Sequence, residues 1–248
     1  MEGLGELLFD LSSTDRVTLL REISKERVRL SQLAMRLSAT VQETSRHLLR
    51  LSHAGLIGKD SEGLYFLTPY GKTVLRLMPS LDFLTKHKKY FVSHDIMPLP
   101  LSFLERIGEL SESTYAEKLG GVLDHTRQVV NEAKEFVWLM ADQILTIDPN
   151  LQKRSLESNV SVRTIIPVTE SAAPQISANL TIPDNLEVRF ADQVSAGIAM
   201  NESLAGVVFH DLSGRIDFNC GFAGRNQVFH GWCRDLFMYQ WEHARKLA

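Results

Sequence analysis

The side chains best suited to chemistry lie in the stretch TVQETSRHLLRLSHAGLI, residues 40–57. Amide, carboxylate and guanidinium groups recur there at helical spacing, and such groups bond to the base edges and phosphates of DNA. The residues expected to face base edges are Gln42, Glu43, Thr44 and Arg46. Those expected to contact phosphate are Thr40, Arg50, Lys59 and, more weakly, Arg36. In this scheme Gln42 pairs with adenine, Arg46 pairs with guanine, and Glu43 accepts a hydrogen bond from cytosine.

A short helix must position these groups. At about 100° per residue, one line of side chains is expected to face inward, with Thr44 and Leu51 at its margins: Val41, Ser45, Leu48 and Ser52. Thr40 is the expected N-cap, Glu43 completes a capping box, and Gly55 ends the helix. An ordinary solvated helix face is the alternative interpretation of the polar side.

The flanking sequence favours DNA recognition over that alternative. RLSQLAMRLSA predicts a second short helix capped by Ser31, and residues 13–24 predict an earlier one. Residues 56–59 and 64–68 predict two strands joined by the polar turn 60–63. Two helices at this spacing are typical of a helix-turn-helix, whose second helix enters the major groove. With the hairpin, the pattern predicts a winged helix-turn-helix.

Two parts of the chain resemble a known family. LSQLAMRLSATVQETSRHLLRLSHAGLI and the hairpin after it are similar to the winged helix-turn-helix of prokaryotic regulators of the arsenical-resistance type. YFVSHDIMPLPLSFLERIGEL, VSVRTIIPV and LSGRIDFNCGFAGRNQVFHGWCRDLFMYQ resemble the sensor domain of archaeal methanogenesis-regulatory proteins. The resemblance implies an archaeal transcriptional regulator whose second domain senses a small molecule or signal, related in fold to a phospholipase D-like domain.

Charge is distributed unevenly along the chain. Of 27 Lys/Arg and 30 Asp/Glu, residues 1–90 hold 14 and 10, so a mildly basic head precedes an acidic body. This distribution suits a protein that binds DNA at one end. Because the excess is small, a homodimer is expected to raise the affinity. Residues 75–84 carry an apolar helical stripe that either dimerises or packs on its own head, with Pro79 kinking or splitting that helix.

The second half predicts a sheet covered on both faces, and therefore an α/β domain. Helices are expected at 121–135, 149–158 and 226–246, and strands at 136–141, 160–168, 186–190, 195–201, 204–211 and 215–222. The expected domains are a winged helix-turn-helix over 1–68, linker and dimerisation helices over 69–119, and an effector-sensing domain over 120–248. A sensor pocket needs an apolar wall with a few polar groups. The candidate ligand-binding residues are Trp138, Arg163, Arg189, His210 and Arg225; if two of the arginines converge, the ligand is an anion.

Catalytic and metal-binding patterns are not found in the sequence. The stretch from His210 to Asp217 has Leu212 where a phospholipase needs lysine, so it predicts a strand-end residue followed by a turn. No Walker loop or His-Glu-x-x-His occurs. His230 and Cys233 lie one helical turn apart, but two ligands do not make a metal site. Cys220 and Cys233 are expected to be reduced thiols in the core or half-buried. The sequence therefore predicts no cofactor, no metal and no enzyme.

These observations together predict a cytoplasmic DNA-binding regulator that acts on double-stranded DNA, with no membrane association. Two alternatives stay open. One is a winged helix that contacts only protein, and the other is an enzyme that handles phosphodiesters in the acidic domain, for which the sequence offers no catalytic constellation.

Overall fold

The structure, a computed structural model, describes residues 3–117, 119–142, 160–168 and 184–246. Its contacts divide the chain into two compact units, Met1–Pro79 and Ser80–Ala248, here called the N-terminal and C-terminal units. The division falls inside helix α5 (Pro69–Lys86), which continues through Pro79 and is not split there. Among the described residues, no helix combines the length and apolar character that a bilayer crossing requires.

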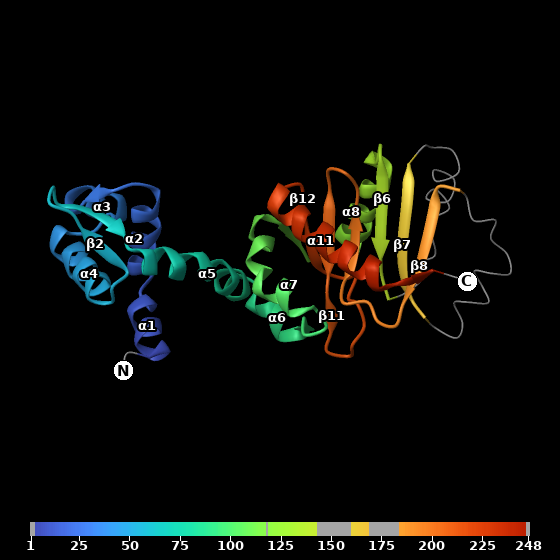
Figure 1. Cartoon of the computed structure of the whole chain (residues 1–248), viewed down its shortest axis with the longest axis horizontal. Coiled ribbons are helices and arrows are strands. Elements are labelled where there is room, and N and C mark those ends of the chain that lie inside the picture. The colour runs from blue at the N-terminus through green and yellow to red at the C-terminus, as the bar shows by residue number, and fades with distance from the viewer. Residues whose placement is uncertain (1–2, 118, 143–159, 169–183, 247–248) are drawn as a thin grey trace. The chain divides into compact units, whose positions relative to one another are not determined.

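The N-terminal unit contains helices, a hairpin and one short extra strand (Figure 1). Its elements before α5 are α1 (Leu4–Leu11), α2 (Thr14–Lys25), β1 (Val28–Arg29), α3 (Leu30–Leu37), α4 (Val41–His53), β2 (Ile57–Lys59) and β3 (Leu64–Leu67). The strands pair antiparallel in the order β1-β3-β2. A core of fully buried leucines from α2, α3 and α4 holds the helices together: Leu19, Leu20, Leu33, Leu48 and Leu51. The helices and the hairpin predicted from residues 13–68 are therefore present.

The hairpin turn forms as its sequence predicts. The Asp60 carboxylate accepts hydrogen bonds from the backbone N–H groups of Glu62 and Leu64, at 3.1 and 2.9 Å. Gly63 has φ of 83°, a left-handed conformation that glycine adopts without steric cost. The prediction for the start of α3 is wrong, because Arg29 is the N-cap residue and Ser31 lies inside the helix. At this end the Gln32 side chain accepts a hydrogen bond from the Arg29 N–H at 3.2 Å.

The C-terminal unit is a mixed α/β structure built on a large sheet (Figure 1). Its helices are α6 (Lys88–Ser93), α7 (Leu101–Glu105), the 3-10 helix η1 (Ile107–Glu112), α8 (Leu119–Glu132) and α11 (Gln227–His243). Its strands are β4 (His94–Asp95), β5 (Thr114–Ala116), β6 (Phe136–Met140), β7 (Ser161–Pro167), β8 (Leu186–Ala191), β9 (Gly197–Met200), β10 (Ala205–Val208), β11 (His210–Asp211), β12 (Gly221–Gly224) and β13 (Arg245–Lys246).

Eight of the described strands form one sheet in the order β13-β8-β7-β6-β9-β10-β12-β5. The β6–β7 and β7–β8 pairs are parallel and the remaining pairs are antiparallel. Successive residues of β6 belong to different cores, since Trp138 and Met140 pack with α11 whereas Val137 packs with α8. Both faces of the sheet are therefore covered, which confirms the predicted α/β class.

Some predicted elements differ from the structure. Residues 215–220 do not form the predicted strand; β12 begins only at Gly221, and the preceding segment turns back on β11 through hydrogen bonds to the Asp211 carboxylate. Alternating apolar residues there fill a loop that packs on the core, which mimics a strand pattern. The predicted helix 149–158 lies outside the described residues. A separate two-stranded sheet pairs β4 with β11, so that His94 lies opposite Asp211.

Candidate functional site

Helix α4 starts with the predicted cap. The Thr40 hydroxyl accepts a hydrogen bond from the Glu43 N–H at 3.2 Å, and the Glu43 carboxylate accepts from the Thr40 N–H and hydroxyl at 3.1 and 2.8 Å. These bonds lower the pKa of the Glu43 carboxyl, the bond from the Thr40 side chain most strongly. The helix ends at His53, and Gly55 follows with φ of 68°. This reciprocal cap fixes the start of the helix that carries the candidate base-reading residues.

The buried side of α4 differs from the predicted one. Thr44, Leu48 and Leu51 are fully buried. Three of the residues expected to face inward are exposed instead, namely Val41, Ser45 and Ser52. Thr44 cannot face a base edge in this conformation, because its hydroxyl is buried and donates to the Thr40 carbonyl at 3.0 Å. Thr44 is therefore not part of the candidate interface, and the predicted inward face of α4 is wrong.

The outward side of α4 carries the other candidate base-reading residues. Gln42, Glu43 and Arg46 are all exposed. Glu43 has one carboxylate oxygen engaged in the cap. The side chains of Gln42 and Arg46 make no hydrogen bond or ion pair with another described residue, although the Arg46 charge helps to lower the pKa of Glu43. Ser45 joins this side and was missed, because a small hydroxyl residue is compatible with close helix packing as well as with exposure. Leu49 is also outward, with 59% of its surface exposed.

The predicted phosphate-contacting residues have different surroundings. Arg50 donates to the Asp10 carboxylate at 2.7 Å, and its guanidinium lies 4.3 Å from the centre of the Phe9 ring. Arg36 forms ion pairs with Glu22 in helix α2 and with Glu26, the residue that follows this helix. Lys59 is exposed on the hairpin, with its ammonium 5.3 Å from the centre of the Tyr65 ring. Lys59 is therefore available to an anion, while Arg36 and Arg50 must first leave carboxylate partners.

Three of the candidate ligand-binding residues lie together in the C-terminal unit. The Arg163 guanidinium is 5.5 Å from the Trp138 ring centre and 5.2 Å from that of Trp241 in α11. The Arg189 guanidinium is 4.3 Å from the Trp241 ring centre and donates to the Trp241 carbonyl at 2.8 Å. Arg189 also pairs with Glu187 at 3.2 Å. Two arginines thus meet at one indole, and an anion bound between them stays a prediction.

The other two ligand candidates do not join that group. His210 is buried in β11, its Nδ1 has no hydrogen-bond partner among the described residues, and burial lowers its pKa. Arg225 donates to Glu132 of α8 at 2.6 Å and to the Ser203 hydroxyl at 3.2 Å. His210 and Arg225 thus contact other residues than the Trp138, Arg163 and Arg189 group does, so the five candidates do not form one pocket.

An apolar cavity lies between α8 and the sheet, and none of the five ligand candidates lines it. Glycines of the strands, such as Gly206 and Gly221, line part of its wall, and a Cβ at either position would contact neighbouring atoms. His125 of α8 contributes the main polar group: its Nε2 is buried without a partner among the described residues, and burial lowers its pKa. His125 was not among the predicted site residues, because a single histidine on a helix gives no spacing signal.

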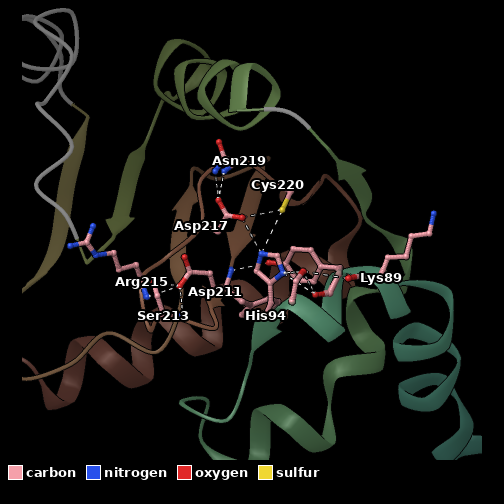
Figure 2. Close-up of polar contacts among 11 residues, drawn as sticks. Lys89, His94, Asp211, Ser213, Arg215, Asp217, Asn219 and Cys220 are labelled. Carbon is pink, nitrogen blue, oxygen red and sulfur yellow. Dashed lines mark hydrogen bonds and ion pairs between the residues drawn. The ribbon is translucent and has the colours of Figure 1, made fainter.

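A further group of polar side chains meets beside β4 and β11, and we call it the His94 cluster: His94, Asp217 and Cys220. The His94 Nε2 lies 3.2 Å from the Asp217 Oδ2 and 3.6 Å from the Cys220 Sγ, and the Cys220 Sγ lies 3.5 Å from the Asp217 Oδ2. Figure 2 shows the three side chains pointing toward one another. Burial, followed by the Asp217 charge, raises the pKa of the Cys220 thiol to about 11. By contrast, Cys233 is buried in the core and His230 bonds the Asn201 carbonyl, so those two residues form no such group.

This chain is distantly similar to several solved structures. No protein-family model matches the chain. No curated protein matches it either. Among solved structures, TrmBL2, described as an archaeal chromatin protein with a novel mode of DNA binding, is 15% identical with a TM-score of 0.45. That match covers 94% of this chain and 92% of TrmBL2. LepI in complex with SAM is 14% identical with a TM-score of 0.24, over 77% of this chain and 61% of LepI.

These likenesses bear on one expectation directly. A structure described as a pericyclic reaction enzyme matches with the same identity, coverage and TM-score as LepI. This finding contradicts the expectation that the chain is not an enzyme, because an enzyme is among the structures that it resembles. A TM-score of 0.24 does not assign that reaction, or any other, to this chain.

Proposed function

We propose that this chain is a transcriptional regulator that binds double-stranded DNA through the outward side of α4. In this proposal α2, α3, α4 and the β2–β3 hairpin act as a winged helix-turn-helix. Only Ser38, Ala39 and Thr40 separate α3 from α4, and Ser38 has the left-handed φ of 53° that lets the chain turn sharply. The hairpin follows α4 after a few residues, as a wing does.

The observation that carries the proposal is the pair of uncommitted side chains on α4. Gln42 and Arg46 are exposed on a capped helix whose opposite side is fully buried at Thr44 and Leu48. Glutamine can make paired hydrogen bonds to adenine and arginine to guanine, so both suit direct readout in the major groove. Thr40, Arg50 and Lys59 are proposed to contact phosphate, which for Arg50 requires exchange of the Asp10 carboxylate for a phosphate oxygen.

Two further features of the proposal concern assembly and control. A homodimer would combine two mildly basic heads, and a two-fold arrangement would match a palindromic operator. The C-terminal unit would sense a small molecule. The candidate location is the cavity beside His125, which combines an apolar wall with a buried ring nitrogen that has no hydrogen-bond partner among the described residues. Its free volume is only about 50 Å³, below the roughly 300–1,000 Å³ of typical ligand pockets, so a bound small molecule would have to enlarge it.

The test is a titration of DNA binding with matched arginine variants. The operator is first selected from random duplexes with the full chain, and affinity is then measured by fluorescence anisotropy. We expect Arg46→Ala to cost about 1–3 kcal/mol on the selected duplex and to relax the preference at one base pair. Lys59→Ala should weaken all sequences alike. Arg127→Ala removes the same charge from an exposed site on α8 in the C-terminal unit and serves as the control.

Unchanged operator binding by Arg46→Ala would overturn the proposed docking of α4. The salt dependence separates DNA binding from a protein-contact role. Binding to phosphates should weaken steeply as salt rises because condensed counterions are released. If the chain selects no duplex and instead retains a protein partner in a salt-insensitive way, the winged helix serves protein contact.

A further inference from the structure

The His94 ring is held in one orientation and one tautomer. It stacks on the Tyr90 ring at 3.7 Å between centroids with 9° between planes. Its Nδ1 lies 2.8 Å from the Tyr90 carbonyl oxygen, which can only accept a hydrogen bond, and 3.0 Å from the Ser93 hydroxyl, which donates to the same carbonyl. Nδ1 therefore carries a proton, and in the neutral ring Nε2 presents a lone pair to Asp217 and Cys220. A histidine that ligates a metal is commonly fixed in this way.

The Asp217 carboxylate is oriented by hydrogen bonds on its far oxygen. Oδ1 accepts from the backbone N–H of Asn219 at 2.8 Å and from the Asn219 side-chain amide at 2.6 Å. These bonds leave Oδ2 directed at His94 and Cys220 (Figure 2). Two of the three residues thus have outer hydrogen-bond partners that aim one electron-rich atom at a common point.

The three inner atoms are short of protons for a hydrogen-bond network. With a neutral His94 ring, the only proton among Nε2, Oδ2 and Sγ belongs to the Cys220 thiol, and one S–H donates to a single acceptor. Nε2 and Oδ2 are then two acceptors 3.2 Å apart, in a place where the His94 side chain is 5% exposed. A shared cation satisfies all three atoms. The competing arrangement is a charged His94 that donates to Asp217.

The distances fit a tetrahedral ion. Zinc lies about 2.0–2.2 Å from nitrogen and oxygen ligands and about 2.3 Å from sulfur, which separates tetrahedral ligand atoms by about 3.3–3.6 Å. The three separations in the His94 cluster are 3.2, 3.5 and 3.6 Å. The N–O pair is the shortest, as the smaller ligand distances require. The cluster therefore has the shape of three corners of a metal-centred tetrahedron.

We propose that His94 Nε2, the Asp217 carboxylate and the Cys220 thiolate bind a divalent transition-metal ion of the zinc class. Imidazole and thiolate ligands favour this class over magnesium or calcium, which prefer oxygen. On binding, the Cys220 thiol releases its proton to solvent and the sulfur forms the metal bond. Three protein ligands leave a fourth position for water or a ligand. The proposal departs from the expectation of no metal, and it does not depend on DNA binding.

The experiment uses the full chain, expressed without a histidine tag, reduced and stripped with a chelator. Addition of Co²⁺ should give a thiolate-to-cobalt charge-transfer band and intense visible bands typical of a tetrahedral site, with saturation at one ion per chain. Zn²⁺ should then displace Co²⁺. Competition with a chromophoric chelator should show affinity lowered at least about 100-fold by Cys220→Ser, Asp217→Asn or His94→Gln, and about 10–100-fold by Asn219→Ala.

Cys233→Ala is the matched control, because Cys233 is a buried core thiol outside the cluster and should leave the cobalt spectrum unchanged. Circular dichroism checks that each variant is folded, and Asp217→Asn provides a second readout if Cys220→Ser is not. A native protein that gives no cobalt spectrum overturns the proposal. So does a charge-transfer band of native strength in Cys220→Ser, since the sulfur would then come from elsewhere.

Discussion

In the proposed function, the Glu43 carboxylate has two roles, one in the cap of α4 and one at a cytosine base. Its hydrogen bonds to Thr40 close the cap of α4 and lower its pKa, so it is ionised and already engaged near neutral pH. Both bonds end on Oε2, so only Oε1 is left to accept from cytosine, in the orientation that the cap imposes. Gln42 and Arg46 have no such commitment, so we expect them to contribute more to sequence discrimination than Glu43.

Arg50 provides a prediction at the same scale, because Asp10 competes with phosphate for its guanidinium. Asp10→Asn keeps the side-chain shape and removes the charge, so Arg50 should become free to contact phosphate. We expect affinity for all duplexes to rise by up to about fivefold, since an exposed ion pair is worth about 0–1 kcal/mol. Fluorescence anisotropy measures the change. Asp124→Asn, which removes an exposed carboxylate from α8, is the control, and weaker binding by Asp10→Asn would contradict the prediction.

The elements were easier to predict than their faces. Thr40, Glu43 and Gly55 mark the ends of α4 by local chemistry, which the sequence contains directly. Its buried face depends on which neighbour packs against it. The observed buried face and the predicted one have only Leu48 in common. Hydrophobicity alone does not distinguish Leu48, which is buried, from Leu49, which is exposed. Tertiary packing decided the face.

The packing of α8 on the sheet gives a prediction about Gly206. A Cβ at this position would lie 2.7 Å from the Cδ2 and Nε2 atoms of His125, which is closer than atoms can pack. Gly206→Ala should therefore lower the free energy of unfolding of the C-terminal unit by about 1–3 kcal/mol, as overpacking does. Urea unfolding followed by circular dichroism measures it. Gly231→Ala in α11 meets no atom within 4 Å and should instead stabilise by up to about 1 kcal/mol. Equal effects of the two changes would refute this account.

His125 also predicts a pH dependence. Burial lowers its pKa, the nearby Ala205 backbone opposes that shift, and the charges of Arg225 and Glu132 act with opposite signs. A lowered pKa means that the unfolded chain binds more protons, so the stabilisation is complete above the ordinary histidine pKa of about 6.5 and is lost as pH falls. Melting temperatures at about pH 7.5 and about pH 5.5 should differ more for the native chain than for His125→Gln. A larger difference in the variant would show the sign to be wrong.

At the scale of the whole molecule, two units that do not share a hydrophobic core predict two unfolding events. Leu48 is fully buried in the N-terminal core and Trp232 in the C-terminal core. Leu48→Ala should destabilise the N-terminal unit by about 2–5 kcal/mol. Calorimetry should then show one transition moving to lower temperature while the other stays. Leu49→Ala, at an exposed position of the same helix, is the control. A single transition that moves as a whole would mean that the units unfold together.

The division of charge and the α/β class could be read from the chain, but the His94 cluster could not. His94 is 123 residues from Asp217 and 126 from Cys220, so no spacing rule connects them. The pairing of β4 with β11 brings His94 beside the loop after β11 that carries Asp217 and Cys220. Sequence spacing likewise gives no sign that Arg163 and Arg189 converge on Trp241 of α11, or that Arg163 also lies over Trp138.

The strand pairings of the C-terminal unit also set an order of events during synthesis. β4 and β5 are made early but pair with β11 and β12, which leave the ribosome about a hundred residues later. β1 and β2, by contrast, find β3 within a few dozen residues. In a nascent chain the N-terminal unit could therefore be folded while β4 and β5 of the C-terminal unit are still unpaired. This interval is when those strand edges are most exposed to aggregation and to chaperones.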